Sequence, residues 1–118
     1  LSHPEQVRTC IRAHKALASE GEISDVYCDW PLPLNGLAII SNRQTPLHRD
    51  KKTAPTMFDF LATCGTYGDG VFTIADLDIR FRYAPGTMIA LCGGALRHMA
   101  AVDDGERVVF AGFMRREL

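Results

Sequence analysis

The sequence predicts a mainly β domain, a small antiparallel β-sandwich or jelly roll with one helix in front. Its 118 residues allow a single domain around one core. From residue 37 onward, short runs rich in β-branched and aromatic residues are separated by Gly, Pro and Asp, a spacing typical of a sandwich or barrel. Helical periodicity is confined to the first twenty residues.

One helix is expected over these first twenty residues. Ser2 and Glu5 form a capping box, Pro4 is tolerated in the first turn, and Gly21 offers the stop. We interpret His14, on the apolar face, as a packed or partner-facing side chain rather than a ligand. The residues expected on that face are Val7, Cys10, Ile11, His14, Leu17 and Ala18.

Strands are expected after the connection over residues 29–36, where Pro31 and Pro33 exclude a helix. Ala84-Pro85-Gly86 suits a turn that needs positive φ at its glycine. The expected strands are Leu37–Asn42, Met57–Thr63, Val71–Ile74, Leu77–Tyr83, Thr87–Cys92, Ala95–Val102 and Arg107–Met114. Alternation with polar residues predicts a buried face made of Leu77, Ile79, Phe81 and Tyr83.

Composition excludes several classes of protein. With 47% hydrophobic and 23% charged residues, the chain does not resemble a disordered, collagen-like or disulfide-dense sequence. No apolar run approaches the roughly 20 residues that span a bilayer, so we expect no membrane partner. A net charge of -1 argues against binding nucleic acid by bulk charge alone. Without a C-x-x-C pair, the four cysteines, Cys10, Cys28, Cys64 and Cys92, are expected to be free thiols in an intracellular protein.

A metal centre is suggested by His48-Arg49-Asp50, an H-x-D triplet that follows the first strand. In an extended segment, residues two apart point the same way, so the imidazole and the carboxylate can converge. His98, in a later strand, offers a second imidazole. Two histidines and one carboxylate on one face of a metal form the facial triad of non-heme Fe(II) oxygenases.

An anion-binding arginine is suggested by the end of the chain. Asp104-Gly105 predicts a two-residue hairpin turn, which would place His98 and Arg107 on the same face of one hairpin. Arg107, among valines, would meet a carboxylate bidentately. Two alternatives stay open: Arg107 begins an edge strand and pairs with Glu106 or Asp103 in water, or Arg115 on the same face takes its role.

The order of these features resembles the double-stranded β-helix of 2-oxoglutarate- and Fe(II)-dependent dioxygenases. More narrowly, residues 42–50 (NRQTPLHRD) and 93–98 (GGALRH) resemble the TET/JBP oxygenases, above all the fungal, transposon-associated type. The resemblance covers roughly residues 35–118 and implies a dioxygenase core there, after a helix and connection in residues 1–34. It also implies that His48, Asp50 and His98 hold Fe(II) and act in catalysis, and that Arg107 binds 2-oxoglutarate.

The family oxidises the 5-methyl group of pyrimidines in DNA, so the resemblance implies 5-methylcytosine or thymine in DNA as substrate and a nuclear location. Asn42 and Arg43 precede the triplet and are candidate substrate contacts, against a turn asparagine and a solvated arginine as the simpler interpretation. Four basic residues and one carboxylate give a local charge of +3 that could meet phosphate. These are Arg43, Arg49, Lys51 and Lys52, with Asp50.

Two other classes of function remain. One is an inactive or truncated β-sandwich binding module derived from the same fold, because few residues precede the predicted core and Leu1 as first residue fits a fragment. The other is a cupin-like enzyme that uses another metal, although such sites use more histidines than the two available here. No Ser-His-Asp or Cys-His pattern suggests a hydrolase.

Overall fold

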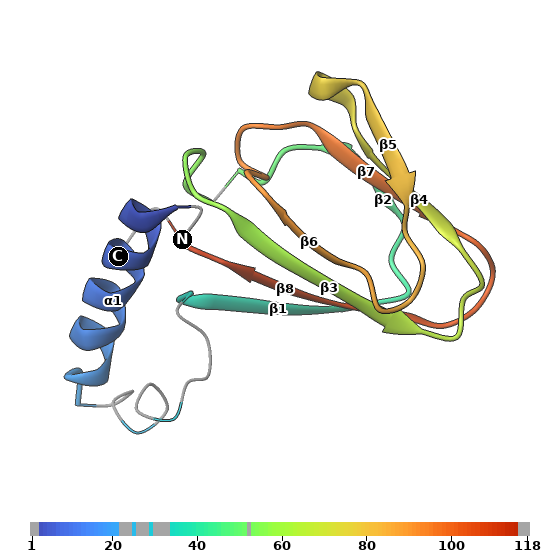
Figure 1. Cartoon of the computed structure of the whole chain (residues 1–118). Coiled ribbons are helices and arrows are strands. Elements are labelled where there is room, and N and C mark those ends of the chain that lie inside the picture. Colours follow the sequence, from blue (N-terminus) through green and yellow to red (C-terminus); the bar gives the residue numbers. More distant parts are fainter. Residues whose placement is uncertain (1–2, 22–24, 26–28, 30–33, 52, 116–118) are drawn as a thin grey trace.

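The computed structural model describes residues 3–21, 25, 29, 34–51 and 53–115. Among these residues it contains one α-helix, eight strands and one turn of 3₁₀ helix, η1 (Figure 1). In chain order they are α1 (Pro4–Ala18), β1 (Gly36–Ser41), β2 (Thr45–His48), β3 (Asp59–Gly65), β4 (Gly70–Ile74), η1 (Ala75–Leu77), β5 (Ile79–Arg82), β6 (Met88–Leu91), β7 (His98–Val102) and β8 (Arg107–Phe113).

The strands form two four-stranded antiparallel sheets. The first sheet has the order β1-β8-β3-β6 and the second has the order β2-β7-β4-β5. Most consecutive strands lie in opposite sheets, so the chain winds back and forth between them (Figure 1). This is the double-stranded β-helix, and the predicted fold class is confirmed.

The core lies between the two sheets, as the alternation of buried and exposed residues along the strands requires. Phe72 and Tyr83 are almost fully buried at its centre, with ring centroids 5.3 Å apart in an edge-to-face arrangement. The buried members of the cluster are Phe72, Ile74, Tyr83, Ile89, Leu91 and Ala100.

Helix α1 packs at one end of the first sheet (Figure 1). The Gln6 side-chain amide donates to the carbonyl oxygen of Phe58 at 2.6 Å and accepts from the Phe58 amide at 2.7 Å. His3 is the N-cap, and its Nδ1 accepts from the Gln6 amide. The capping-box residue Ser2 lies outside the described residues. The helix ends at Ala18 rather than near Gly21, and Ile11 is 48% exposed, so the predicted apolar face is narrower than expected.

The predicted hairpin around Asp104-Gly105 is wrong. Strand β7 belongs to the second sheet and β8 to the first, so the two do not pair. Instead, the connection bonds to the β3–β4 connection: the Asp103 amide donates to Asp69, and the Thr66 amide donates to Glu106. The chain bends at this dipeptide, but the packing of the two sheets against each other, and not this local signal, determines which strands pair.

Two further strand predictions need correction. The strand expected to begin at Leu77 begins at Ile79, because residues 75–77 form η1 and Asp78 adopts left-handed backbone with φ of 52°. Leu77 and Ile79 are therefore exposed, and only Phe81 and Tyr83 of the predicted face turn inward. Strand β2 was not predicted as a strand, since it is short and contains Pro46.

The turn predicted at Ala84-Pro85-Gly86 is present. The Thr87 amide donates to the Ala84 carbonyl oxygen and Gly86 has φ of 92°, which confirms the predicted turn. The thiols of Cys10, Cys64 and Cys92 are free, and Cys28 lies outside the described residues. Within the described part of the chain, no helix has the length and apolar character needed to cross a membrane.

Candidate metal centre

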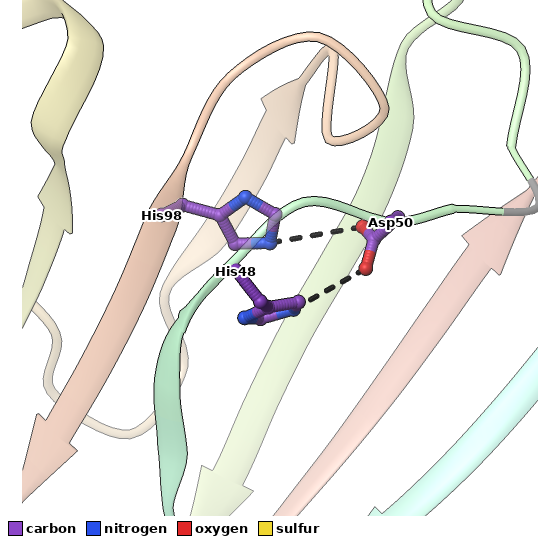
Figure 2. A group of neighbouring side chains, drawn as sticks. All are labelled: His48, Asp50 and His98. Atoms are coloured by element: carbon purple, nitrogen blue, oxygen red, sulfur yellow. Dashed lines mark ion pairs between the residues drawn. The ribbon is translucent and has the colours of Figure 1, made fainter.

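Two histidines meet at the edge where strands β2 and β7 pair. His48 ends β2 and His98 begins β7, and their Cα atoms are register partners. Their imidazole centroids lie 4.4 Å apart (Figure 2). The antiparallel pairing of two strands distant in sequence therefore places both rings on one site.

Asp50 completes the group two residues after His48. Its backbone amide donates to the Gly93 carbonyl oxygen at 2.9 Å, which fixes the segment beside the connection between β6 and β7. Asp50 Oδ1 lies 3.3 Å from His48 Nε2, and Oδ2 lies 3.7 Å from His98 Nε2 (Figure 2). One ligand atom from each of the three residues lies within 4.8 Å of the others, a group that could hold a metal ion.

Both imidazoles are oriented by backbone carbonyl groups. His48 Nδ1 lies 2.7 Å from the Pro46 carbonyl oxygen, and His98 Nδ1 lies 2.8 Å from that of Leu96. Because a carbonyl oxygen only accepts, each Nδ1 carries the proton. Each Nε2 then faces Asp50, and without a proton it is the nitrogen through which the ring would bind a metal ion.

The site is closed on one side and open on the other. The His98 side chain is 4% exposed and stacks on Phe72, with centroids 5.8 Å apart and an interplanar angle of 11°. The side chains of His48 and Asp50 are 36% and 35% exposed. A ligand or substrate can therefore reach the group from the side of His48 and Asp50.

Arg107 is a buried cation at the start of β8, only 3% exposed. Its Nη2 donates to the Arg43 carbonyl oxygen and to Thr45 Oγ1, and its guanidinium carbon lies 5.9 Å from the centroid of the Tyr83 ring. Among the described residues, no carboxylate forms an ion pair with it. Pairing with Glu106 or Asp103 in water is therefore excluded for the described structure, and a buried guanidinium without a counter-ion favours an anionic ligand.

Arg107 and the triad face the same interior from opposite sheets. His98 and Arg107 are both 3% exposed. A row of ring contacts connects them in space: His98 stacks on Phe72, Phe72 packs against Tyr83, and Tyr83 contacts the Arg107 guanidinium. Arg115 is exposed, and its guanidinium carbon lies 5.9 Å from the centroid of the Phe113 ring. The structure thus places Arg107, rather than Arg115, on the interior side.

The candidate substrate residues serve contacts within the chain. Asn42 has φ of 53°; its Oδ1 accepts from the Arg107 amide at 2.7 Å and its Nδ2 donates to Glu106. Arg43 is exposed and contributes its carbonyl oxygen to Arg107. A role for either residue toward a substrate stays a prediction. In the predicted basic segment, Arg49 and Lys51 are exposed, and Lys52 lies outside the described residues.

Asp59, at the start of β3, is a site residue that the sequence reasoning missed. It is 4% exposed, and neither carboxylate oxygen has a hydrogen-bond partner. A Cβ on Gly93 would clash with Asp50 Oδ2 and would lie 2.6 Å from Asp59 Oδ2, so the two carboxylates flank this glycine. Burial, aided by the charge of Asp50, raises the pKa of Asp59 to about 7. A lone carboxylate within the apolar run of residues 57–63 was the available signal.

Comparison with known proteins supports the fold. No protein-family model matches the chain, and no curated protein matches it. Twelve chains of solved structures match. One is NgTET1 in complex with DNA containing 5-methylcytosine, with a TM-score of 0.66 and 18% sequence identity. The match covers 89% of this chain and 42% of that one, so this chain spans less than half of the NgTET1 structure. The fold is therefore TET-like.

Proposed function

We propose that the protein is an Fe(II)- and 2-oxoglutarate-dependent dioxygenase of the TET/JBP type. Its substrate would be DNA, in which it oxidises the 5-methyl group of 5-methylcytosine or thymine. The observation that carries this proposal is the convergence of His48, Asp50 and His98 in a TET-like fold. The sequence motifs are nearest to those of the fungal, transposon-associated members, and a DNA substrate implies a nuclear location.

The donor set fits Fe(II). Two imidazole nitrogens and one carboxylate oxygen are its ligands in the facial triad, which leaves other coordination positions open. Both imidazoles already present Nε2 to the shared site, because the Pro46 and Leu96 carbonyl groups hold the Nδ1 protons. The chemistry supplied by bound Fe(II) is the activation of O2 for removing hydrogen from an unactivated methyl group.

Arg107 would bind the distal carboxylate of 2-oxoglutarate. Its guanidinium is buried without a carboxylate partner in the described structure, and a carboxylate matches its planar donors bidentately. Tyr83 beneath the guanidinium limits where it can move. The other end of the co-substrate would then face the triad.

The DNA assignment is supported by the 5-methylcytosine DNA in the NgTET1 structure and by the exposed side of the triad. Arg49 and Lys51 are exposed on either side of Asp50 in the sequence and would be available to phosphate groups. A base in duplex DNA must leave the stack to reach the group. Asn42 and Arg43 remain candidate substrate contacts beside Arg107.

The test is an anaerobic titration with Fe(II) and 2-oxoglutarate, followed by turnover in air. We expect a visible charge-transfer band in the wild-type protein and its loss in His48→Ala and Asp50→Ala. His14→Ala, on helix α1, is the matched control and should keep the band. Absence of the band from well-folded wild-type protein would overturn the enzyme assignment.

Succinate release separates the substrates. We expect more succinate with DNA that contains 5-methylcytosine than with unmethylated DNA of the same sequence, and oxidised cytosine in the hydrolysed product. Equal release in both would remove the DNA assignment and leave the dioxygenase. Iron and 2-oxoglutarate binding without any turnover would favour the alternative, an inactive binding module.

A further inference from the structure

One carboxylate outside the triad contacts both ligand-bearing segments. Asp76 lies in η1, between β4 and β5, and its side chain is 23% exposed. Asp76 Oδ1 accepts from Arg97 Nε at 2.8 Å and Oδ2 accepts from the Arg97 backbone amide at 2.8 Å. Arg49 Nη2 lies 3.8 Å from Oδ2. Arg97 directly precedes His98, and Arg49 stands between His48 and Asp50 in the sequence.

The bond to the Arg97 amide acts on the peptide group that orients His98. That amide and the Leu96 carbonyl group belong to one planar peptide unit. The Leu96 oxygen accepts from His98 Nδ1 at 2.8 Å, on the opposite edge of the same plane from the N–H that Asp76 holds. A rotation of this peptide would therefore turn the carbonyl oxygen away from His98 Nδ1.

A second bond fixes η1 itself against this peptide segment. The Ala75 amide donates to the Arg97 carbonyl oxygen at 2.9 Å, so Asp76 is held at a defined position beside Arg97. The hydrogen bonds from Arg97 lower the pKa of Asp76, which keeps the carboxylate charged. A charged acceptor on the N–H polarises the peptide and strengthens its carbonyl oxygen as an acceptor.

We propose that Asp76 is a positioning residue for the metal centre, acting on His98 through the peptide between Leu96 and Arg97. Through Arg49 it also ties the segment that carries His48 and Asp50 to the same point. The inference rests on the proposed metal-binding function for its first readout, whereas its second readout is independent of any metal.

The first readout is the affinity for Co(II), used as the probe in place of Fe(II). We expect Asp76→Ala to weaken Co(II) binding by about 10-fold, as is typical when a partner beyond the ligands is lost. Asp76→Asn should weaken it less, since the amide oxygen can still accept from the Arg97 N–H. The affinities come from the visible absorption of bound Co(II).

The chain offers a matched control in Asp69. Its Oδ1 accepts from the Gly70 amide at 2.8 Å and its Oδ2 accepts from Arg82 Nε at 2.9 Å. Like Asp76, it therefore accepts from one backbone amide and one arginine Nε, but away from the triad. Asp69→Ala should leave the Co(II) affinity unchanged. An equal loss of affinity in Asp69→Ala and Asp76→Ala would overturn the proposal, because the effect would then be general destabilisation.

The second readout is the His98 Nδ1 proton of the metal-free protein, observed by NMR. We expect a slowly exchanging signal in the wild-type protein and in Asp69→Ala, and faster exchange in Asp76→Ala. An unchanged signal and unchanged Co(II) affinity in Asp76→Ala would overturn the proposal. If wild-type protein binds no Co(II), the proposed function fails, and the exchange rate alone decides the role of Asp76.

Discussion

Asp59 shows how strongly the environment of one residue can change its chemistry. Its carboxyl group is buried without a hydrogen-bond partner, and Asp50 lies across Gly93 from it. Desolvation and the neighbouring charge both favour the protonated form. Ionisation of Asp59 therefore lowers the free energy of unfolding of the metal-free protein.

Stability of the metal-free protein should fall as pH rises from about 4 to about 7. The pKa of Asp59 is about 7 when folded, against 3.8 as its ordinary value, so the folded state binds more protons across this range. At most about 4 kcal/mol is at stake, from about 1.4 kcal/mol per pH unit. Urea unfolding at several pH values measures the slope, which Asp59→Asn should remove. A slope that persists in Asp59→Asn would assign it to other groups.

Arg107→Ala should weaken 2-oxoglutarate binding and leave metal binding intact. A charge-assisted hydrogen bond contributes about 1.5–3 kcal/mol, which corresponds to roughly a 10- to 100-fold change in affinity. Calorimetric titration of the metal-loaded protein measures both effects. Arg115→Ala is the control, since that side chain is exposed. A comparable loss in both variants would argue against Arg107 as the anion site.

Sequence could identify the triad but not its supporting residues. The H-x-D triplet and the distal histidine carry a pattern of residue types and order that can be recognised. Asp59 carries only the weak signal of a carboxylate in an apolar run, and its environment depends on burial in the folded chain. Asp76 carries no signal, because its role depends on contacts with Arg97, 21 residues away. Only the folded chain brings Asp76 to the peptide that precedes His98.

At the scale of elements, the site depends on how β2 and the connection before β7 approach each other. The Asp50 amide bonds to Gly93, and a side chain at residue 93 would collide with the carboxylates of Asp50 and Asp59. Glycine at this position therefore leaves the space that the two carboxylates occupy.

Gly93→Ala should lower both stability and metal affinity. Overpacking of this kind costs about 1–3 kcal/mol, and the nearest atom that must move belongs to a proposed ligand. Thermal unfolding and Co(II) titration measure the two effects. Gly21→Ala is the control, because a Cβ there meets nothing within 4 Å. Unchanged Co(II) affinity in Gly93→Ala would show that Asp50 is free to shift.

Local sequence signals predict the positions of strands better than they predict which strands pair. Seven strand positions were found approximately, because β-branched runs and turn residues act within a few residues. The Asp104-Gly105 turn was assigned to a hairpin, yet β7 and β8 lie in different sheets. Strand β2 was missed because Pro46 argues against a strand, although its pairing with β7 supports His48.

At the scale of the whole molecule, the proposed ligands come together only when the chain is folded. His48 lies 50 residues before His98 and Asp50 lies 48 residues before it. His48 ends β2 and Asp50 follows that strand, whereas His98 begins β7. Binding restricted to the folded state stabilises it by mass action. Metal binding and folding are therefore expected to be coupled.

A saturating divalent metal ion should raise the midpoint of thermal unfolding. At one hundred times the dissociation constant, the gain is about 2.7 kcal/mol. For a domain of this size that corresponds to a shift on the order of 10 °C. Differential scanning fluorimetry with Co(II) and with a chelator measures it. The shift should vanish in His48→Ala and persist in His14→Ala, and its persistence in His48→Ala would place the metal elsewhere.

The pairing of β1 with β8 has a consequence for how the chain folds. Gly36 is the register partner of Phe113, so β1 and β8, the first and last strands among the described residues, are neighbours in the first sheet. Such pairing closes a long loop, whose entropy must be lost before the contact contributes, and it slows folding. During synthesis the first sheet stays open until its final strand emerges from the ribosome. Until then, the strand edges of β1 and β3 that pair with β8 remain without partners, and such unpaired edges promote aggregation.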